Sequence, residues 1–123
     1  MNPYAEEAEQ RWGGTPEFAE SQRRTAAYQD DDWERIKAEA ADVSARFAAL
    51  MAAGAAATGT DAMNLAEEHR QHISRWFYEC TSEIHRGLGT MYVDDPRFAQ
   101  NYESVAPGLA AYIRDAIHAN AAR

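Results

Sequence analysis

The chain has 123 residues, enough for one domain with a modest hydrophobic core. Its 20 acidic and 12 basic residues give a net charge of −8, which argues against direct binding of nucleic acid by this domain. The single cysteine, Cys80, excludes an internal disulfide; without a long apolar run or an N-terminal leader pattern, we expect no membrane partner and a cytoplasmic location. Abundant alanine and scarce β-branched residues predict an all-α fold.

Aromatic residues supply the bulky apolar side chains of the first 32 residues, which contain no Leu, Ile or Val. Thr15-Pro16 predicts a helix start there, since Thr is a favoured N-cap and Pro a favoured first residue. A few buried rings return less free energy than ordering the whole segment costs, so the segment should order firmly only under another apolar surface. We therefore predict a conditionally ordered lid over residues 1–32 and a helical ligand-binding core over residues 33–123. The lid aromatics are Tyr4, Trp12, Phe18 and Tyr28.

A long amphipathic helix is predicted by the apolar spacing that begins at Trp33. Three aspartates, residues 30–32, lie at its start, where carboxylates interact favourably with the helix dipole. Gly54 is placed to end the helix in a left-handed conformation. The apolar stripe consists of Trp33, Ile36, Ala40, Val43, Phe47 and Leu50.

A second helix is predicted from Asp61 to about Tyr78, with Thr60 or Asp61 as its N-cap. It carries two histidines, His69 and His72, whose spacing of three places them on one side of the helix. With two further ligands this spacing could hold a metal ion, but the His-Glu-x-x-His pattern of zinc sites is absent. The alternative is one histidine at the edge of the core and the other on the surface.

A third helix, over residues 83–93, should be capped by Thr81 or Ser82. Gly87 and Gly89 weaken it and indicate either a kink or a close approach of another group to the backbone. The Gly-Leu-Gly element is too short for a dinucleotide loop. Cys80, just before the cap, is either a small buried hydrophobe or a thiol whose pKa is lowered by the helix start.

Two prolines mark the starts of the remaining helices. Asp95-Pro96 predicts a short helix, with Asp as N-cap and Pro in the first turn, and Pro107 predicts the start of the last helix. The inward side chains of the last helix are expected to be Leu109, Tyr112, Ile113, Ala116 and Ile117.

Aromatic residues concentrate in the second half of the chain, around the glycine pair. Some must belong to the core, but amphipathic rings also line concave apolar ligand sites, where their polar tips orient the ligand. The histidines next to Trp76 and the underpacked lid favour a ligand cleft. The residues concerned are Trp76, Phe77, Tyr78, Tyr92, Phe98, Tyr102 and Tyr112.

Five stretches carry a likeness to a known family: EQRWGGT (9–15), DWERI (32–36), HRQHISRWFYEC (69–80), LGTMYVDDPRF (88–98) and PGLAAY (107–112). Together they resemble the TipAS domain, the antibiotic-recognition domain of MerR-family transcriptional regulators, over nearly the whole chain. The resemblance implies a globin-like all-α fold without haem, and a cleft for thiopeptides such as thiostrepton and other large aromatic natural products. It also implies an N-terminal segment that folds over the bound ligand.

The resemblance further implies a DNA-binding MerR head ahead of the domain in full-length relatives, and a drug-sequestering role where the domain occurs alone. It implies neither a cofactor nor a metal. In this family a cysteine just before the Leu-Gly pair captures dehydroalanine-containing drugs covalently. Gly87 occupies that position here, so we expect reversible binding.

Three functional hypotheses follow. The first is a binding domain, not an enzyme, whose lid orders over a large aromatic ligand. The second is a small helical metalloprotein or enzyme that uses His69 and His72, and the third is a helical interaction domain without a small-molecule ligand. We adopt the first, in which rings stack on the ligand's heterocycles while histidines and tyrosine hydroxyls orient its amides. The predicted ligand-binding residues are Trp12, Phe18, Tyr28, Trp33, His69, His72, Trp76, Tyr78, Tyr92, Phe98 and Tyr102.

Overall fold

The computed structural model describes residues 14–123, and the regular structure in this part of the chain is entirely helical. The predicted all-α class is therefore confirmed. None of the helices described is long and apolar enough to cross a bilayer. The helices are α2 (Pro16–Thr25), α3 (Asp30–Ala52), α4 (Thr60–Trp76), α5 (Ser82–Asp94), α6 (Pro96–Glu103) and α7 (Leu109–Ala122).

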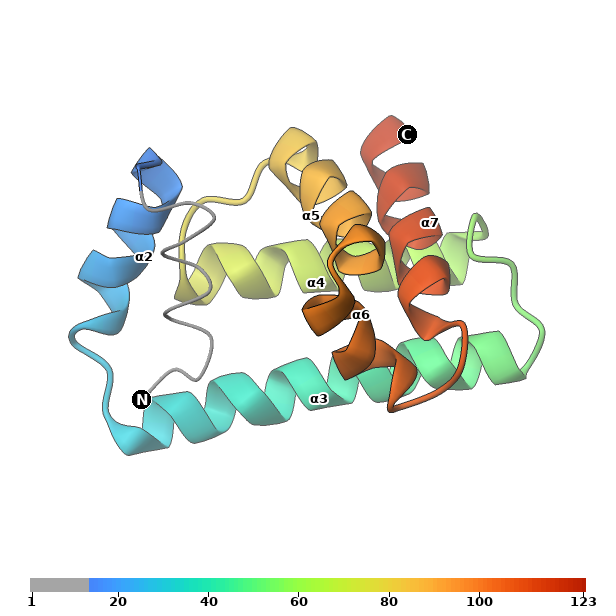
Figure 1. Ribbon diagram of the computed structural model, residues 1–123, viewed down its shortest axis with the longest axis horizontal. Coiled ribbons are helices and arrows are strands. Elements are labelled where there is room, and N and C mark those ends of the chain that lie inside the picture. The colour runs from blue at the N-terminus through green and yellow to red at the C-terminus, as the bar shows by residue number, and fades with distance from the viewer. Residues whose placement is uncertain (1–13) are drawn as a thin grey trace.

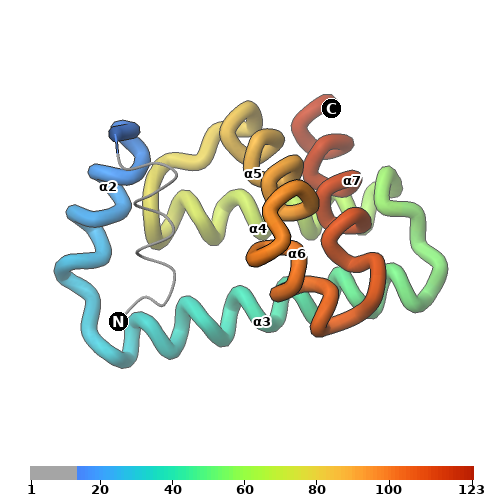
Figure 2. The backbone as a smooth tube through the Cα atoms, in the orientation of Figure 1, coloured from blue at the N-terminus to red at the C-terminus, as the bar shows by residue number. Residues whose placement is uncertain are grey.

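Helices α3 and α4 form a long antiparallel pair, joined by residues 53–59 (Figure 1). α5 and α7 cross this pair steeply and run antiparallel to each other, with the short α6 between them in sequence. α2 stands apart from α5 to α7, at the end of the molecule where α3 begins and α4 ends (Figure 2). The N-terminal helix therefore meets the rest of the protein at one end of the α3–α4 pair.

The hydrophobic core lies where α3, α4, α5 and α7 meet. Phe47 of α3 and Ile113 of α7 are each 1% exposed, and Leu109 and Ile117 of α7 are fully buried. The predicted stripe of α3 is confirmed at Ile36, Val43 and Phe47, which are buried. Ala40 of the same stripe is exposed, contrary to the prediction. No side chain of α2 is buried, so this helix adds little to the core.

Three predicted N-caps are confirmed. In each, a side-chain oxygen accepts a hydrogen bond from a backbone N–H of the first turn, which would otherwise lack a partner. The donor and acceptor pairs are Phe18 N and Thr15 Oγ1 (3.2 Å), Ile84 N and Thr81 Oγ1 (3.2 Å), and Arg97 N and Asp95 Oδ1 (3.0 Å).

The predicted caps of α4 are wrong. Gly59 occupies the N-cap position with an extended backbone, so Thr60 and Asp61 both lie inside the first turn. The helix also ends at Trp76, two residues before the predicted Tyr78.

The predicted start of α7 at Pro107 is also wrong: the helix begins at Leu109. Gly108 has φ of +86°, a left-handed conformation that suits glycine and turns the chain before the helix starts. The carboxylate of Glu103 replaces a side-chain cap, accepting hydrogen bonds from the N–H groups of Gly108 (2.8 Å) and Ala110 (3.0 Å).

Glycines explain how α5 packs and how α3 ends. α5 runs unbroken through both of its glycines. A Cβ at Gly89 would lie 3.2 Å from Cγ2 of Ile117, whereas one at Gly87 would meet nothing within 4 Å. The predicted close approach is therefore found at Gly89, where α5 lies against α7. Gly54, with φ of +80°, follows the end of α3 as predicted.

Candidate functional site

A cluster of rings lies where the segment predicted to form the lid meets α3 and the end of α4. Tyr28, in the connection between α2 and α3, packs edge-on against Trp33 (ring centroids 5.8 Å apart) and Trp76 (5.5 Å). Phe77 extends the cluster, 6.3 Å from Trp33. The lid thus contributes one ring, α3 one and the end of α4 two, and each ring except the buried Trp76 is half-buried.

Glu39 of α3 fixes the α4 side of this cluster. Its Oε1 accepts a hydrogen bond from Trp76 Nε1 at 2.8 Å and lies 3.4 Å from His72 Nε2. Its other oxygen lies 3.8 Å from the Arg75 guanidinium. Burial lowers the pKa of His72, although the nearby Glu39 carboxylate acts in the opposite direction. The carboxylate therefore holds the indole of Trp76 in one orientation.

Two histidines, His69 of α4 and His85 of α5, face each other in the interior. Nδ1 of His69 and Nε2 of His85 are 2.8 Å apart, and their rings stack with centroids at 5.0 Å. Burial lowers the pKa of His69 to about 3 and that of His85 to about 4. Both are therefore neutral near pH 7, and a single N–H joins the two rings.

Tyr92 connects this pair to α6. Its ring lies edge-on to His69 (5.9 Å) and close to Tyr102 (5.2 Å) and Phe98 (6.2 Å). Burial raises the pKa of Tyr92 well above its ordinary value, so its hydroxyl stays protonated. Phe98 and Tyr102 are half-buried, and Tyr92 is 8% exposed. α6 thus adds two partly accessible rings to a buried one.

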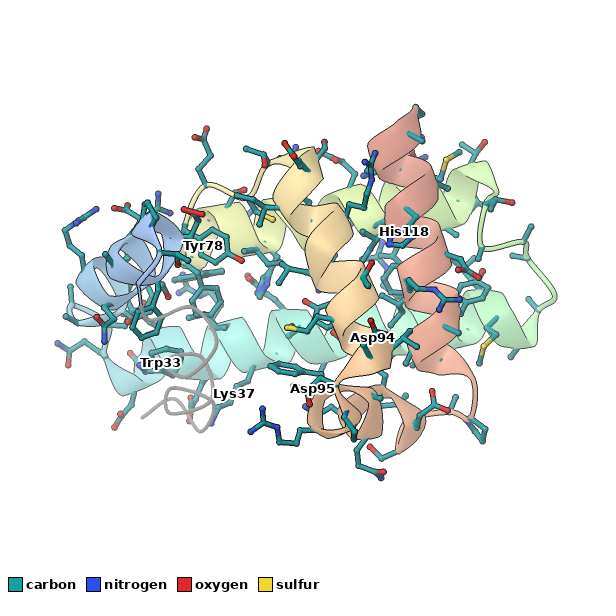
Figure 3. All side chains as sticks on the ribbon, turned by 45° about the horizontal axis from the view of Figure 1, so that its top comes forward. Trp33, Lys37, Tyr78, Asp94, Asp95 and His118 are labelled. Atoms are coloured by element: carbon teal, nitrogen blue, oxygen red, sulfur yellow. The ribbon has the colours of Figure 1, made fainter. Side chains whose placement is uncertain are left out.

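Tyr78, in the loop after α4, is half-buried and packs against the hydrophobic core. Burial is the main cause that raises its pKa, and the charge of Glu17 on α2 adds to the effect. Tyr78 in turn acts electrostatically on Tyr92 and raises the pKa of that tyrosine. Figure 3 shows Tyr78 beside the end of α2, on the same side of the molecule as Trp33. Tyr78 is therefore a half-buried tyrosine that is influenced by a charge on α2 and itself influences Tyr92 of α5.

Most of the predicted site residues are thus brought into two adjacent groups. The lid junction holds Tyr28, Trp33, Trp76 and, through Glu39, His72; the second group holds His69, Tyr92, Phe98 and Tyr102, and Tyr78 acts electrostatically on Tyr92. Phe18 is half-buried on α2, and Trp12 lies outside the described residues.

Sequence reasoning missed the role of Glu39, which falls on the polar side of the α3 pattern and so counts as a surface residue. It also missed Arg24 of α2, whose Nη1 donates to the Ser74 oxygen of α4 at 2.7 Å. The signal for both was weak: a charged side chain gives no periodicity that identifies a partner on another helix.

Cys80 is a buried hydrophobe and not a reactive thiol. It is fully buried, and burial raises its pKa to about 12, so the nucleophilic thiolate is scarce at neutral pH. Over residues 14–123, moreover, no three His, Cys, Asp or Glu side chains are grouped as metal ligands.

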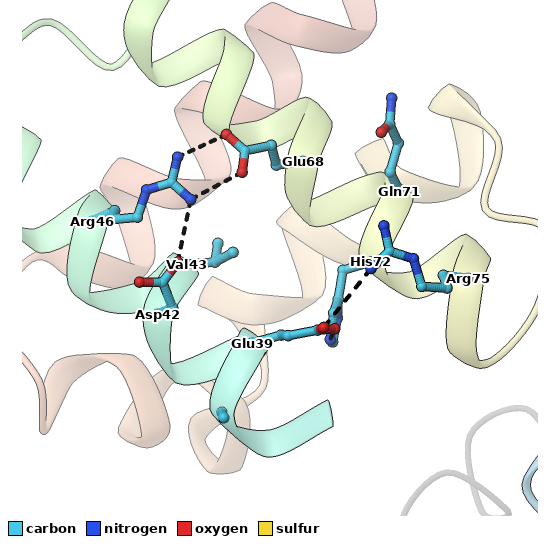
Figure 4. Close-up of a pocket in the computed structure, with 9 residues that line it drawn as sticks. Glu39, Asp42, Val43, Arg46, Glu68, Gln71, His72 and Arg75 are labelled. Atoms are coloured by element: carbon cyan, nitrogen blue, oxygen red, sulfur yellow. Dashed lines mark hydrogen bonds and ion pairs between the residues drawn. The ribbon is translucent and has the colours of Figure 1, made fainter. Parts of the chain in front are cut away.

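Two grooves follow the α3–α4 pair, and the first reaches the lid junction at Glu39 and His72. One, of about 400 Å³, is lined mainly by charged side chains, with Arg46 donating two hydrogen bonds to the Glu68 carboxylate (2.9 and 2.8 Å) (Figure 4). The other, of about 440 Å³, shares these two residues. Of the predicted site residues only His72 lines either groove, so neither is the expected aromatic cleft.

Comparison with known proteins identifies relatives over almost the whole chain. The profile of the TipAS antibiotic-recognition domain matches residues 4–120. The HTH-type transcriptional activator TipA of Streptomyces coelicolor is 51% identical over 120 residues, 98% of this chain and 47% of the relative. The HTH-type transcriptional activator mta of Bacillus subtilis is 40% identical over 115 residues, 93% of this chain and 43% of the relative. The chain thus spans about half the length of these relatives.

Solved structures agree with this relationship. TipAS from Streptomyces lividans in complex with nosiheptide gives a TM-score of 0.91 at 50% identity, covering 100% of this chain and 87% of that one. The antibiotic binding domain of a TipA-class multidrug resistance transcriptional regulator gives 0.68 at 54% identity, covering 74% and 97%. The predicted globin-like fold is therefore confirmed, and the chain belongs to the TipAS antibiotic-recognition domain family.

Proposed function

We propose that this chain binds thiopeptide-like and other large aromatic antibiotics in a cleft that the lid closes. The observation that carries the proposal is the match of the entire chain, lid helix included, to TipAS in complex with nosiheptide. The fully buried Cys80 is the chain's single cysteine and Gly87 offers no thiol, so binding is reversible.

The two ring groups would form the walls of this cleft. Half-buried rings such as Trp33, Tyr78 and Phe98 retain exposed area that a flat heterocycle can cover, which favours stacking. Residues 1–32 act as the lid, and residues 33–123 as the core that receives the ligand. Ordering the lid on binding costs free energy, which reduces the affinity. The ordered, closed lid is then the conformational change that reports a bound ligand.

The chain's wider role is as the effector-sensing part of a MerR-type transcriptional activator, or as a stand-alone protein that sequesters the drug. It acts in the cytoplasm as a binding protein and not as an enzyme. The support is that the relatives found are HTH-type transcriptional activators, in which a counterpart of this chain is less than half of the protein.

Titration with nosiheptide, followed by calorimetry and thermal unfolding, tests the proposal. At a free ligand concentration of 100 times Kd, the complex should gain about 2.7 kcal/mol of stability. Phe98→Ala should weaken binding at least fivefold. Leu50→Ala removes a comparable half-buried side chain at the far end of α3 and should leave Kd unchanged. Absence of binding to nosiheptide and thiostrepton by the wild-type chain would refute the proposal.

A further inference from the structure

The C-terminal end of α4 receives hydrogen bonds from the lid. An α-helix leaves its last four carbonyl oxygens without partners inside the helix, and in α4 these belong to residues 73–76. The Ile73 oxygen accepts from the N–H groups of Phe77 and Tyr78. The Ser74 oxygen accepts from Arg24 Nη1 at 2.7 Å, and the Trp76 oxygen from the Tyr28 hydroxyl at 2.5 Å.

Both donors come from the end of the lid nearest the core. Arg24 lies in the last turn of α2, where Glu20 Oε2 accepts from its Nε at 2.6 Å and orients the guanidinium. Tyr28 lies three residues past the end of α2. Figure 1 shows α2 beside the end of α4, and these two bonds account for that placement.

Arg24 and Tyr28 are chemically suited to the C-terminal end of α4. A helix C-terminus carries partial negative charge, so the Arg24 cation is favoured there over a neutral donor. The Tyr28 ring also packs against Trp76, so its hydroxyl and its ring hold the same residue.

The receiving turn is held by the core independently of the lid. Trp76 Nε1 donates to Glu39 of α3, and the Cys80 N–H donates to Ser74 Oγ at 3.0 Å. The two carbonyls are therefore presented in a fixed arrangement.

We propose that Arg24 and Tyr28, with the Ser74 and Trp76 carbonyls, form a latch that sets the equilibrium between open and closed lid. The inference rests on the proposed function, because a lid position matters only if a ligand binds beneath it. Arg24 and the Tyr28 hydroxyl are then positioning groups: they raise the population of the closed state, whereas the Tyr28 ring remains part of the cleft wall. Apparent affinity falls in proportion to that population.

Four variants test the latch with nosiheptide as the probe. Arg24→Gln removes the bond to Ser74, whereas Arg23→Gln removes the neighbouring charge, which pairs with Glu20 on the same helix. Tyr28→Phe removes the bond to Trp76 but keeps the ring. Tyr112→Phe removes an equivalent hydroxyl bond, to the Ala55 oxygen at 2.8 Å, away from the lid.

Arg24→Gln and Tyr28→Phe should each raise Kd about tenfold, which corresponds to 1.4 kcal/mol, mainly through faster dissociation. Amide exchange of residues 16–28 in the complex should accelerate by a similar factor, while exchange in α4 and α7 stays at the wild-type rate. The two control variants should stay within twofold of wild type in both measurements. Equal behaviour of Arg24→Gln and Arg23→Gln, with wild-type behaviour of Tyr28→Phe, overturns the latch.

Thiostrepton, used as a second probe, separates a latch from a ligand contact. A latch lowers the affinity for both drugs by the same factor, whereas factors that differ more than threefold overturn it. If wild-type protein binds neither drug, the proposed function fails alone. The latch is then judged by exchange of residues 16–28 in ligand-free protein: faster exchange in Arg24→Gln than in Arg23→Gln supports it, and equal rates overturn it.

Discussion

Nδ1 of His69 and Nε2 of His85 lie 2.8 Å apart in the interior, so the folded protein accommodates one N–H between two neutral rings. Protonating both would place two charges against each other in a buried site. Burial has the largest effect on His85 and lowers its pKa. The two charged groups that act on His85 have smaller and opposite effects, since Arg70 lowers its pKa and Glu67 raises it. On His69 burial also dominates, with His85 and His72 acting in the same direction.

We predict that this pair makes the protein sensitive to acid. Both histidines have a lower pKa in the folded than in the unfolded chain, so below about pH 6.5 the unfolded chain binds more protons. Stability from the pair is fully present above that pH and is lost as pH falls toward about 4, by up to about 1.4 kcal/mol per pH unit for each histidine. Urea unfolding from pH 7 to pH 4.5 measures the slope. His85→Gln should reduce it, and a wild-type slope that His85→Gln leaves unaltered contradicts the prediction.

The two glycines of α5 should respond oppositely to alanine. Gly87→Ala should stabilise the protein by about 0.5–1 kcal/mol, because alanine favours the helix and its Cβ meets nothing within 4 Å. Gly89→Ala should destabilise it by about 1–3 kcal/mol, because its Cβ would crowd the fully buried Ile117. Thermal and denaturant unfolding compare the two variants. A stabilising Gly89→Ala would show that α5 and α7 can separate without cost.

Cys80 should resist alkylation in the folded protein. Its pKa of about 12 leaves roughly one thiol in ten thousand ionised at pH 8, and the sulfur is fully buried. Iodoacetamide labelling followed by mass spectrometry should therefore proceed only as fast as the protein unfolds. Gly87→Cys provides the matched control, since position 87 is exposed on the same stretch of chain and its thiol should react quickly. Rapid labelling of Cys80 in the wild-type chain would be inconsistent with this burial.

Removing the Glu39 carboxylate should loosen the α4 side of the lid junction. Glu39→Ala leaves Trp76 Nε1 without its acceptor, so we expect a loss of about 1–3 kcal/mol of stability and altered tryptophan fluorescence. Glu34→Ala, on the exposed side of the same helix, should change neither. Identical fluorescence for Glu39→Ala and wild type would mean that another group orients the indole.

Local chemistry was predictable from the sequence, and contacts between helices were not. Thr15, Thr81 and Asp95 cap their helices because capping depends on residues only a few positions apart. Gly108 shows the limit, since its left-handed turn displaces a helix start that Pro107 alone indicates.

The site residues divide in the same way. Periodicity placed His69 near the core, but its pairing with His85, sixteen residues away, depends on how α4 and α5 cross. The bond from Glu39 to Trp76 likewise depends on the crossing of α3 and α4. A one-dimensional pattern identifies which side of a helix is apolar, but not which residue of another helix it meets.

The lid's two hydrogen bonds to α4 end on main-chain oxygens, which every amino acid supplies. A substitution at position 74 or 76 would therefore leave the acceptor oxygen itself in place, although it would remove the side-chain bonds of Ser74 and Trp76 that steady the turn. The register of α2 on α4 is thus set by the path of the main chain through the last turn of α4, and Arg24 and Tyr28 are the two side chains that read it.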